Sequence, residues 1–267
     1  SYLEGKTPNP CYVCNQQFRW NFLLKWAFSM NAQSLASGHY ARLQEENGQW
    51  QLLRGVDAGK DQSYMLSGLN QEMFAHMLLP LGTWNKTDIR QKARELGLEV
   101  AEKEDSQDLC FLGKQDYRDF LKDHTPQVVS PGNIVNKWGD VLGRHEGLAF
   151  YTIGQRKGLG LTSEKPLYVI KKLVRSNELV VGYEEELGQR ELFCDHFNWI
   201  SGTALTASQR YMVKIRYRAD FRAAEVDVID EDQVKIVFDE PLRDITPGQI
   251  AVVYDGDKVI GSGIIRL

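Results

Sequence analysis

The chain is built around the stretch Pro8-Asn9-Pro10-Cys11-Tyr12-Val13-Cys14-Asn15, which places two thiols three residues apart in a proline-stiffened loop. From residue 15 to about residue 31 the sequence predicts an amphipathic helix. Its apolar side chains at helical spacing are Phe18, Phe22, Leu23, Trp26 and Ala27. Cys14 would then precede the helix N-terminus, where free N–H groups and the helix dipole favour a thiolate. The pattern predicts a reactive cysteine; a buried, unreactive thiol is the alternative.

A third thiol, Cys110, follows the polar stretch Asp105-Ser106-Gln107-Asp108-Leu109. Residues 102–108 show no apolar periodicity, so we expect a mobile loop that could carry Cys110 into and out of a site. The alternative is a surface loop with an incidental cysteine. Together with Cys11 and Cys14, this residue predicts a site of cysteine chemistry.

The composition excludes several classes of protein. The chain has 267 residues, of which 42% are hydrophobic and 25% charged, as in a globular protein of two or three domains. No apolar run is long enough to span a membrane, and Ser1 does not begin a signal peptide. A net charge of −4 means that RNA binding would need local basic patches. Four cysteines are too few for a disulfide scaffold and indicate metal, redox or catalytic use in a reducing compartment.

The first part of the chain reads as α/β. A short buried strand is expected at 35–40, ending in the turn Gly38-His39, and strand ends of this kind hold ligands in α/β folds. A hairpin is expected around Asn47-Gly48. The stretch Lys60-Asp61-Gln62 opens a helix to about residue 78, with Asp61 as its N-cap. Further helices are expected at 87–96 and 115–122, and short strands at 98–101, 133–136 and 148–153.

The second part reads as all β. Short segments rich in β-branched and aromatic residues fit a small antiparallel barrel. These segments are 167–170, 178–181, 211–217, 224–229, 234–238, 250–254 and 259–267. Lys214, Arg216 and Arg218 alternate with apolar residues, which predicts a basic strand face that either contacts a nucleic-acid backbone or is simply solvated. The glycine-rich stretch at 154–160 carries Arg156 and Lys157, which suit an RNA phosphate or a tight inter-domain turn.

Taken together, these stretches resemble the tRNA-specific 2-thiouridylase family, which converts the wobble uridine of certain tRNAs to 2-thiouridine. The resemblance covers essentially the whole chain in order. Its motifs are Gly5-Lys6-Thr7-Pro8-Asn9-Pro10 through Cys14-Asn15, Ser37-Gly38-His39-Tyr40-Ala41-Arg42, Leu53-Arg54-Gly55 with Lys60-Asp61-Gln62-Ser63-Tyr64, Asp105-Ser106 to Cys110-Phe111, the stretch 154–160, Arg216-Tyr217-Arg218 and Thr246-Pro247-Gly248-Gln249. It implies a partial adenine-nucleotide α-hydrolase-like, Rossmann-type α/β domain (1–112), a small central α+β domain (113–163) and a C-terminal antiparallel β-barrel (164–267).

The resemblance also implies roles for single residues. Cys14 matches the catalytic nucleophile, and Cys110 matches the cysteine that carries sulfur as a persulfide and can close a disulfide with Cys14. The expected contacts of the target base are Asn9, Pro10 and Cys11. Gly38 matches an ATP-binding glycine. The expected tRNA-binding residues are His39, Lys60, Asp61, Gln62, Arg216, Tyr217 and Gln249.

The implied activity is ATP-dependent 2-thiolation of uridine 34 in tRNAs of the Lys, Glu and Gln type. ATP with Mg²⁺ would adenylate the base, and a persulfide would then deliver sulfur. The sulfur would come from a donor protein such as a cysteine desulfurase or a sulfur relay. The resemblance implies a cytoplasmic protein, with an organellar address left open, and no membrane partner.

Two departures from the family pattern leave alternatives. The family begins with a glycine- and serine-rich pyrophosphate loop, which this sequence lacks, so little ATP-dependent thiolation and a tRNA-binding fragment are the alternative expectation. Many relatives carry Asp where this chain has Cys11, so Cys11, Cys14 and Cys110 could instead bind a [4Fe–4S] cluster. Zinc held with Cys194 as a fourth ligand is a further, less favoured possibility.

Overall fold

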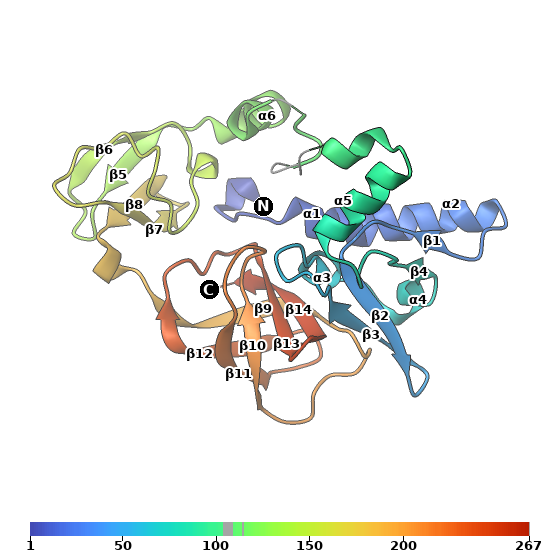
Figure 1. The fold of residues 1–267 in the computed structure, drawn as a ribbon. Coiled ribbons are helices and arrows are strands. Elements are labelled where there is room, and N and C mark those ends of the chain that lie inside the picture. The colour runs from blue at the N-terminus through green and yellow to red at the C-terminus, as the bar shows by residue number, and fades with distance from the viewer. Residues whose placement is uncertain (104–108, 114, 267) are drawn as a thin grey trace.

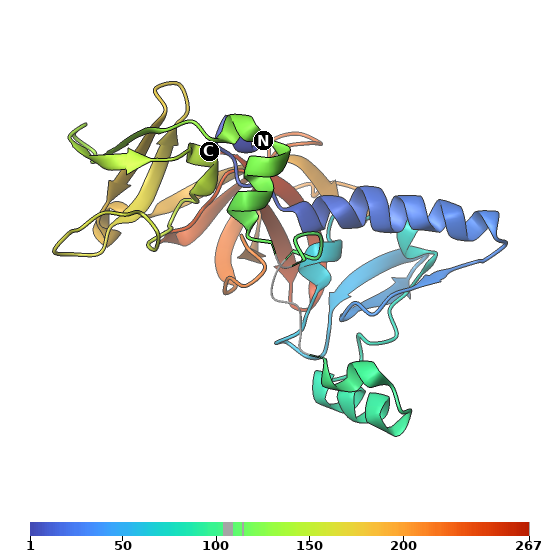
Figure 2. The same cartoon turned by 90° about the horizontal axis from the view of Figure 1, so that it is seen from above.

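The structure, a computed structural model, describes residues 1–103, 109–113 and 115–266. Figure 1 shows an N-terminal part with a long helix, a small central sheet and a C-terminal β-barrel. Seen from above in Figure 2, the long helix and the central sheet extend to opposite sides of the barrel. From residue 104 on, the loop predicted at 102–108 lies outside the described residues.

One continuous helix carries the first two cysteines. It begins at Pro10 because the Asn9 side chain accepts the Tyr12 N–H at 3.1 Å, and because proline at the first helical position needs no N–H partner. The sequence prediction started this helix at residue 15, so it was wrong to place Cys14 ahead of the N-terminus: Cys14 lies within the helix. Its segments are α1 (Pro10–Val13), a π-helical middle (Cys14–Phe22) and α2 (Leu23–Ser29).

The buried face of this helix differs from the face that the apolar spacing suggested. Trp20 and Leu24 are buried, whereas Phe18, Phe22 and Trp26 are 69%, 61% and 57% exposed. The helix carries apolar residues on more than one face, so periodicity identified the helix but not its buried side.

A parallel strand pair follows the helix. Strand β1 (Leu35–Ala36) pairs with β4 (Met77–Leu78), and β1 is shorter than the strand expected at 35–40. Two short helices and a short strand replace the helix expected at 61–78. Gly68 lies between the two short helices. Only glycine fits at this position, because a Cβ there would lie 2.4 Å from the Tyr12 ring. These elements are α3 (Ser63–Leu66), α4 (Gln71–Phe74) and strand β4.

The C-terminal strands form a closed antiparallel barrel, in the order β13-β10-β11-β12-β9-β14, closed by the pairing of β13 with β14. The expected hairpin of β2 and β3 around Asn47-Gly48 is confirmed, and it joins the barrel where Leu53 pairs with Lys258. Strand β9 was not predicted, because the left-handed backbone at His196 interrupts the alternation of side chains. The strands are β2 (Ala41–Glu46), β3 (Gln49–Arg54), β9 (Gln189–Trp199), β10 (Gln209–Lys214), β11 (Arg222–Val228), β12 (Val234–Leu242), β13 (Ile250–Asp255) and β14 (Lys258–Arg266).

The central sheet has the order β6-β5-β8-β7. Strands β7 (Tyr168–Leu173) and β8 (Glu178–Gly182) were expected in the barrel domain (164–267), and this placement was wrong. Strand β8 pairs in parallel with β5 (Gly132–Val135), and its apolar side chains share a core with Ile134 and Val169. We therefore place the boundary between the central and C-terminal domains after β8.

The remaining elements connect these parts. Helices α5 and α6 were predicted to within two residues at each end. The expected strands at 98–101 and 148–153 were wrong, because short 3₁₀ helices occupy both places. The bounds are α5 (Lys86–Glu95), α6 (Tyr117–His124), β6 (Val141–His145) and the 3₁₀ helices Tyr2–Glu4, Glu99–Glu102, Pro126–Val128, Leu148–Phe150 and Glu184–Glu186.

Candidate active site

A cavity of about 700 Å³ lies where the long helix, the turn at 109–112, α6 and the loop after β10 meet. This volume is in the range of small-molecule sites. Its lining residues are Pro10, Cys11, Cys14, Asn15, Arg19, His39, Gln62, Met65, Leu109, Cys110, Phe111, Leu112, Tyr117, Arg216, Tyr217 and Arg218. The cavity thus brings together three thiols from segments almost 100 residues apart in the chain.

The three cavity thiols differ in environment. Cys11 and Cys14 are partly buried, and Cys110 is exposed. Burial raises the pKa of Cys11, the neighbouring Cys110 and Cys14 raise it further, and Arg19 opposes them. Cys11 is therefore held as a neutral thiol. Cys110 is the thiol most accessible to an external sulfur donor.

Cys194 lies apart from the other cysteines. It is fully buried in β9 within the barrel core, and burial raises its pKa. The zinc site with Cys194 as a fourth ligand was therefore a wrong expectation. The part of the chain that the structure describes contains no group of three His, Cys, Asp or Glu side chains arranged to hold a metal ion. The arrangement of Cys11, Cys14 and Cys110 thus does not fit an iron–sulfur cluster.

His39 and Arg19 form the polar wall of the cavity. The Arg19 guanidinium donates to His39 Nε2 at 3.3 Å, so Nδ1 carries the proton and donates to Ser37 Oγ at 2.6 Å. Burial, and secondly the charge of Arg19, lowers the pKa of His39 to about 4. His39 is therefore a neutral hydrogen-bonding group at physiological pH.

This neutral histidine predicts a pH-dependent stability. In the unfolded chain His39 takes up a proton below about pH 6.5, whereas the folded chain resists protonation down to about pH 4. The free energy of unfolding should therefore fall by about 2 kcal/mol between about pH 7.5 and about pH 5. Urea unfolding at both pH values checks this, and His39→Gln should remove that part of the pH dependence. An unchanged pH dependence in His39→Gln would contradict the assignment.

The Cys110 turn is attached to the central domain. The Phe111 ring lies 5.1 Å from Phe120 on α6, and Phe120 stacks on His124 at 4.1 Å between ring centroids. The next residue, Leu112, is buried. The position of Cys110 therefore depends on helix α6.

Three family models match most of the chain, one after another. They are described as the tRNA methyl transferase HUP domain (residues 1–114), the tRNA methyl transferase PRC-barrel domain (118–183) and the aminomethyltransferase beta-barrel domain (189–265). Proteins named tRNA-specific 2-thiouridylase MnmA from Clostridium acetobutylicum and Moorella thermoacetica are 43% and 45% identical over 265 and 268 residues. These alignments cover 99% and 100% of this chain and 75% of each relative. The chain belongs to the MnmA family.

The MnmA family models agree with the observed domains. The matches confirm the predicted fold class of an α/β domain with a barrel. They correspond to a HUP domain, a PRC-barrel-like middle domain and a C-terminal β-barrel. The middle model ends at residue 183, after β8, as the sheet pairing does.

Most of the expected MnmA site residues line the cavity, but not all. The cavity contains Pro10, Cys11, Cys14, His39, Gln62, Cys110, Arg216 and Tyr217. Outside its lining are Asn9, Gly38, Lys60, Asp61 and Gln249. Sequence reasoning assigned no role to Asn15, Arg19, Met65, Phe111 or Tyr117. No local signal identified Arg19: it lies five residues after Cys14 on the same helix, whereas side chains on one helix face are three or four residues apart.

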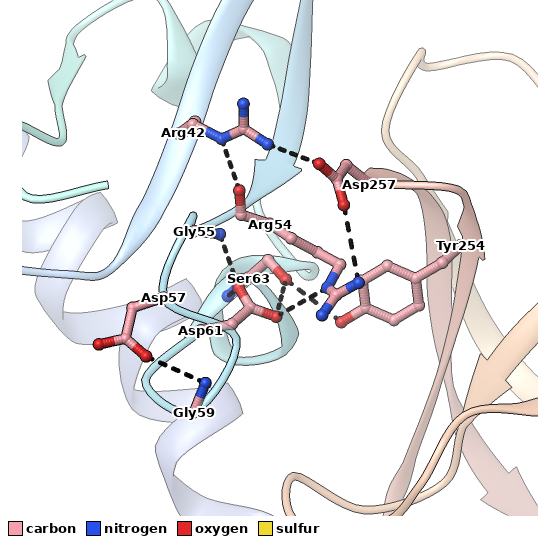
Figure 3. Close-up of polar contacts among 9 residues, drawn as sticks. All are labelled: Arg42, Arg54, Gly55, Asp57, Gly59, Asp61, Ser63, Tyr254 and Asp257. Carbon is pink, nitrogen blue, oxygen red and sulfur yellow. Dashed lines mark hydrogen bonds and ion pairs between the residues drawn. The ribbon is translucent and has the colours of Figure 1, made fainter. Parts of the chain in front are cut away.

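Asp61 lies at the centre of a buried polar network (Figure 3). Its carboxylate accepts the N–H groups of Gly55 and Ser63, each at 3.0 Å, and lies 3.6 Å from Arg54 Nε. It is only 8% exposed. Arg54 also reaches Asp257 in the barrel at 3.6 Å. These contacts fix the turn that presents Lys60 and Gln62, so we infer that Asp61 acts by positioning them.

Arg216 lies in the loop after β10, and its side chain is fixed by hydrogen bonds to backbone carbonyl groups. Strand β10 ends at Lys214, so the predicted basic strand face of Lys214, Arg216 and Arg218 was wrong. The Arg216 guanidinium donates to the carbonyl oxygens of Ile153 and Asp244, both at 3.0 Å, in the loops around the cavity. Arg216 thus joins the barrel to the central domain at the cavity edge.

Gln249 holds the loop that leads into the cysteine helix. Its Nε2 donates to the Thr7 carbonyl oxygen at 2.9 Å, and the Thr7 N–H donates to Pro247 O at 2.8 Å. Gly248 has a φ of +90°, and a Cβ there would lie 3.1 Å from the Thr7 backbone. The turn at 246–249 therefore sets the position of Asn9 and Cys11.

Gly248→Ala should consequently destabilise the protein and loosen this loop. We expect a loss of about 2–3 kcal/mol in the free energy of unfolding, from backbone strain and the tight contact together. Gly256→Ala is the matched control, because Gly256 also has a positive φ but no atom within 4 Å of its Cβ position, and should cost about 1 kcal/mol. Urea unfolding and the rate of Cys11 alkylation check this. Equal costs and equal alkylation rates in the two variants would refute the role of the turn.

The described residues contain no helix long and apolar enough to cross a membrane.

Proposed function

We propose that this chain transfers sulfur to tRNA, forming 2-thiouridine at the wobble position 34. One observation carries the proposal: Cys14 and Cys110 line the same cavity, together with six of the residues that the family resemblance assigns to the base and the tRNA, namely Pro10, Cys11, His39, Gln62, Arg216 and Tyr217. The alignment of nearly the whole chain with the MnmA relatives supports it.

The expected chemistry explains why two cysteines are needed. The C2 carbonyl of uridine is a poor electrophile, and ATP with Mg²⁺, when bound, would supply the adenylyl group that makes its oxygen a leaving group. A persulfide on Cys110 presents its terminal sulfur to C2. Cys14 then attacks the inner sulfur, which breaks the S–S bond, leaves the outer sulfur on C2 and forms a Cys14–Cys110 disulfide. A thiol reductant must restore the two cysteines for the next turnover.

The geometry around Gly38 supports nucleotide binding there. Gly38 follows β1 at its carboxyl end and is exposed, and a Cβ at this position would meet only Leu81 at 3.6 Å. Carboxyl ends of parallel strands are where α/β folds bind nucleotides. The Gly38 backbone is therefore open to a close ligand.

The cavity also suits a base that leaves its stack. Enzymes that modify a base must extrude it into a pocket, and the cavity can hold a pyrimidine. Exposed Cys110 can meet a sulfur-donor protein, such as a cysteine desulfurase or a relay protein, before the base enters. We propose cytoplasmic tRNAs of the Lys, Glu and Gln type as substrates.

The test is thiolation of a tRNA of the Lys type with ATP, Mg²⁺, cysteine and a cysteine desulfurase. We expect 2-thiouridine, detected as a retarded band on a gel containing an organomercury group. Cys14→Ser and Cys110→Ser should give no product but bind the tRNA as the wild type does. Tight tRNA binding by the wild type with no thiolation would leave a binding protein and contradict the proposal.

A further inference from the structure

The charge of the cavity is one-sided. Its described lining includes Arg19, Arg216 and Arg218 and contains no Asp or Glu. Arg216 lies 3.5 Å from the Asp244 carboxylate, and Arg218 also has a partner. Arg19 differs from them, because its hydrogen bond goes to the ring of His39 and no ion pair joins it to a carboxylate among the described residues.

The contact with His39 orients Arg19 without neutralising it. His39 accepts through Nε2 and is itself uncharged, so the guanidinium keeps its full positive charge in the cavity. Arg19 also lies close enough to Cys11 to influence that thiol. A guanidinium of fixed orientation that has no carboxylate partner in the described part of the chain suits an anion with several oxygen acceptors.

The position of Arg19 indicates which anion it meets. Its partner His39 follows Gly38, at the carboxyl end of β1 where a nucleotide is expected, and Arg19 lines the same cavity as the three cysteines. We propose that Arg19 binds the phosphate of the adenylated uridine, an adenosine monophosphate ester, within this cavity. This inference rests on the proposed function.

The role follows from the charge that the reaction develops. When sulfur attacks C2, the C2–O bond breaks and its electron pair leaves with the oxygen of AMP. The phosphate therefore gains negative charge as the bond breaks, and a fixed cation beside it stabilises the transition state. Arg19 would hold the ester before the reaction and AMP after it.

The test is calorimetric titration of the full chain with AMP. Arg19→Gln should weaken AMP binding about 10-fold or more, since it removes charge-assisted hydrogen bonds. Arg19→Lys, which keeps the charge, should stay within about 3-fold of the wild type. Lys25→Gln is the matched control, because Lys25 is an exposed cation on the same long helix but outside the cavity, and should not change AMP binding. Thermal unfolding of each variant excludes a folding defect.

Two results would overturn the inference. One is AMP binding that is unchanged in Arg19→Gln while tRNA binding weakens, because Arg19 would then contact the RNA backbone. The other is a wild-type chain that does not bind AMP at millimolar concentration. Sulfur loading of Cys110 needs no nucleotide, so it tests the proposed function separately from Arg19.

Discussion

Replacing Asp61 by alanine should lower the free energy of unfolding by about 3–5 kcal/mol, as expected when one partner of a buried ion pair is removed. The loss would leave the N–H groups of Gly55 and Ser63 without their acceptor, and Arg54, which lies over the Phe221 ring, without its buried carboxylate. Urea unfolding measures the effect.

Asp257→Ala is the matched control for this prediction. Asp257 also pairs with Arg54, at 3.6 Å, but its side chain is 59% exposed. An exposed pair contributes about 1 kcal/mol or less, so the control should remain nearly as stable as the wild type. If Asp61→Ala unfolds like the wild type and only loses tRNA affinity, Asp61 is a direct RNA contact, as the resemblance first suggested.

Replacing Cys110 by serine should lower the rate of tRNA thiolation about a thousandfold or more, because the group that carries the sulfur is lost. Cys14→Ser should block turnover at a different step: Cys110 still accepts sulfur, but no thiol cleaves the persulfide. Rapid-quench assays of thiolated tRNA measure both.

Cys194→Ala is the control for Cys110→Ser, because it removes a thiol that lies outside the cavity. Cys194 is buried in the barrel core, so its replacement should reduce stability but leave the thiolation rate of the folded protein near that of the wild type. Equal loss of activity in Cys194→Ala and Cys110→Ser would contradict the assignment of Cys110.

The sequence predicted those parts of the fold that depend on local signals. Asn47-Gly48 specified the hairpin, and short strands with turns between them indicated the barrel. Strands β7 and β8 were misplaced because β8, which pairs with β7, also pairs in parallel with β5, more than 40 residues earlier, and nothing local specifies such a pairing.

In the candidate site, too, local signals were present in the sequence, whereas contacts between distant residues could not be predicted. Asn9 is an N-cap residue and Pro10 a first-turn proline, so the sequence contains a local signal for the early start of the helix, although the missing apolar period predicted a loop. The resemblance identified many of the residues that line the cavity. It did not separate them from Asp61 and Gln249, which lie outside the lining and hydrogen-bond to backbone groups of the protein itself. Arg19 was missed because its importance lies in its lack of a carboxylate partner among the described residues, which only the folded chain reveals.

The central claim is that Cys110 carries the sulfur in a cavity shared with Cys14. The most direct measurement is peptide-resolved mass spectrometry of anaerobically purified protein after incubation with cysteine and a cysteine desulfurase. We predict one additional sulfur atom per chain, on the peptide that contains Cys110, and none in Cys110→Ser. Sulfur on Cys11 or Cys14 instead, or bound iron with acid-labile sulfide that is lost when any of the three cysteines is replaced, would contradict the account.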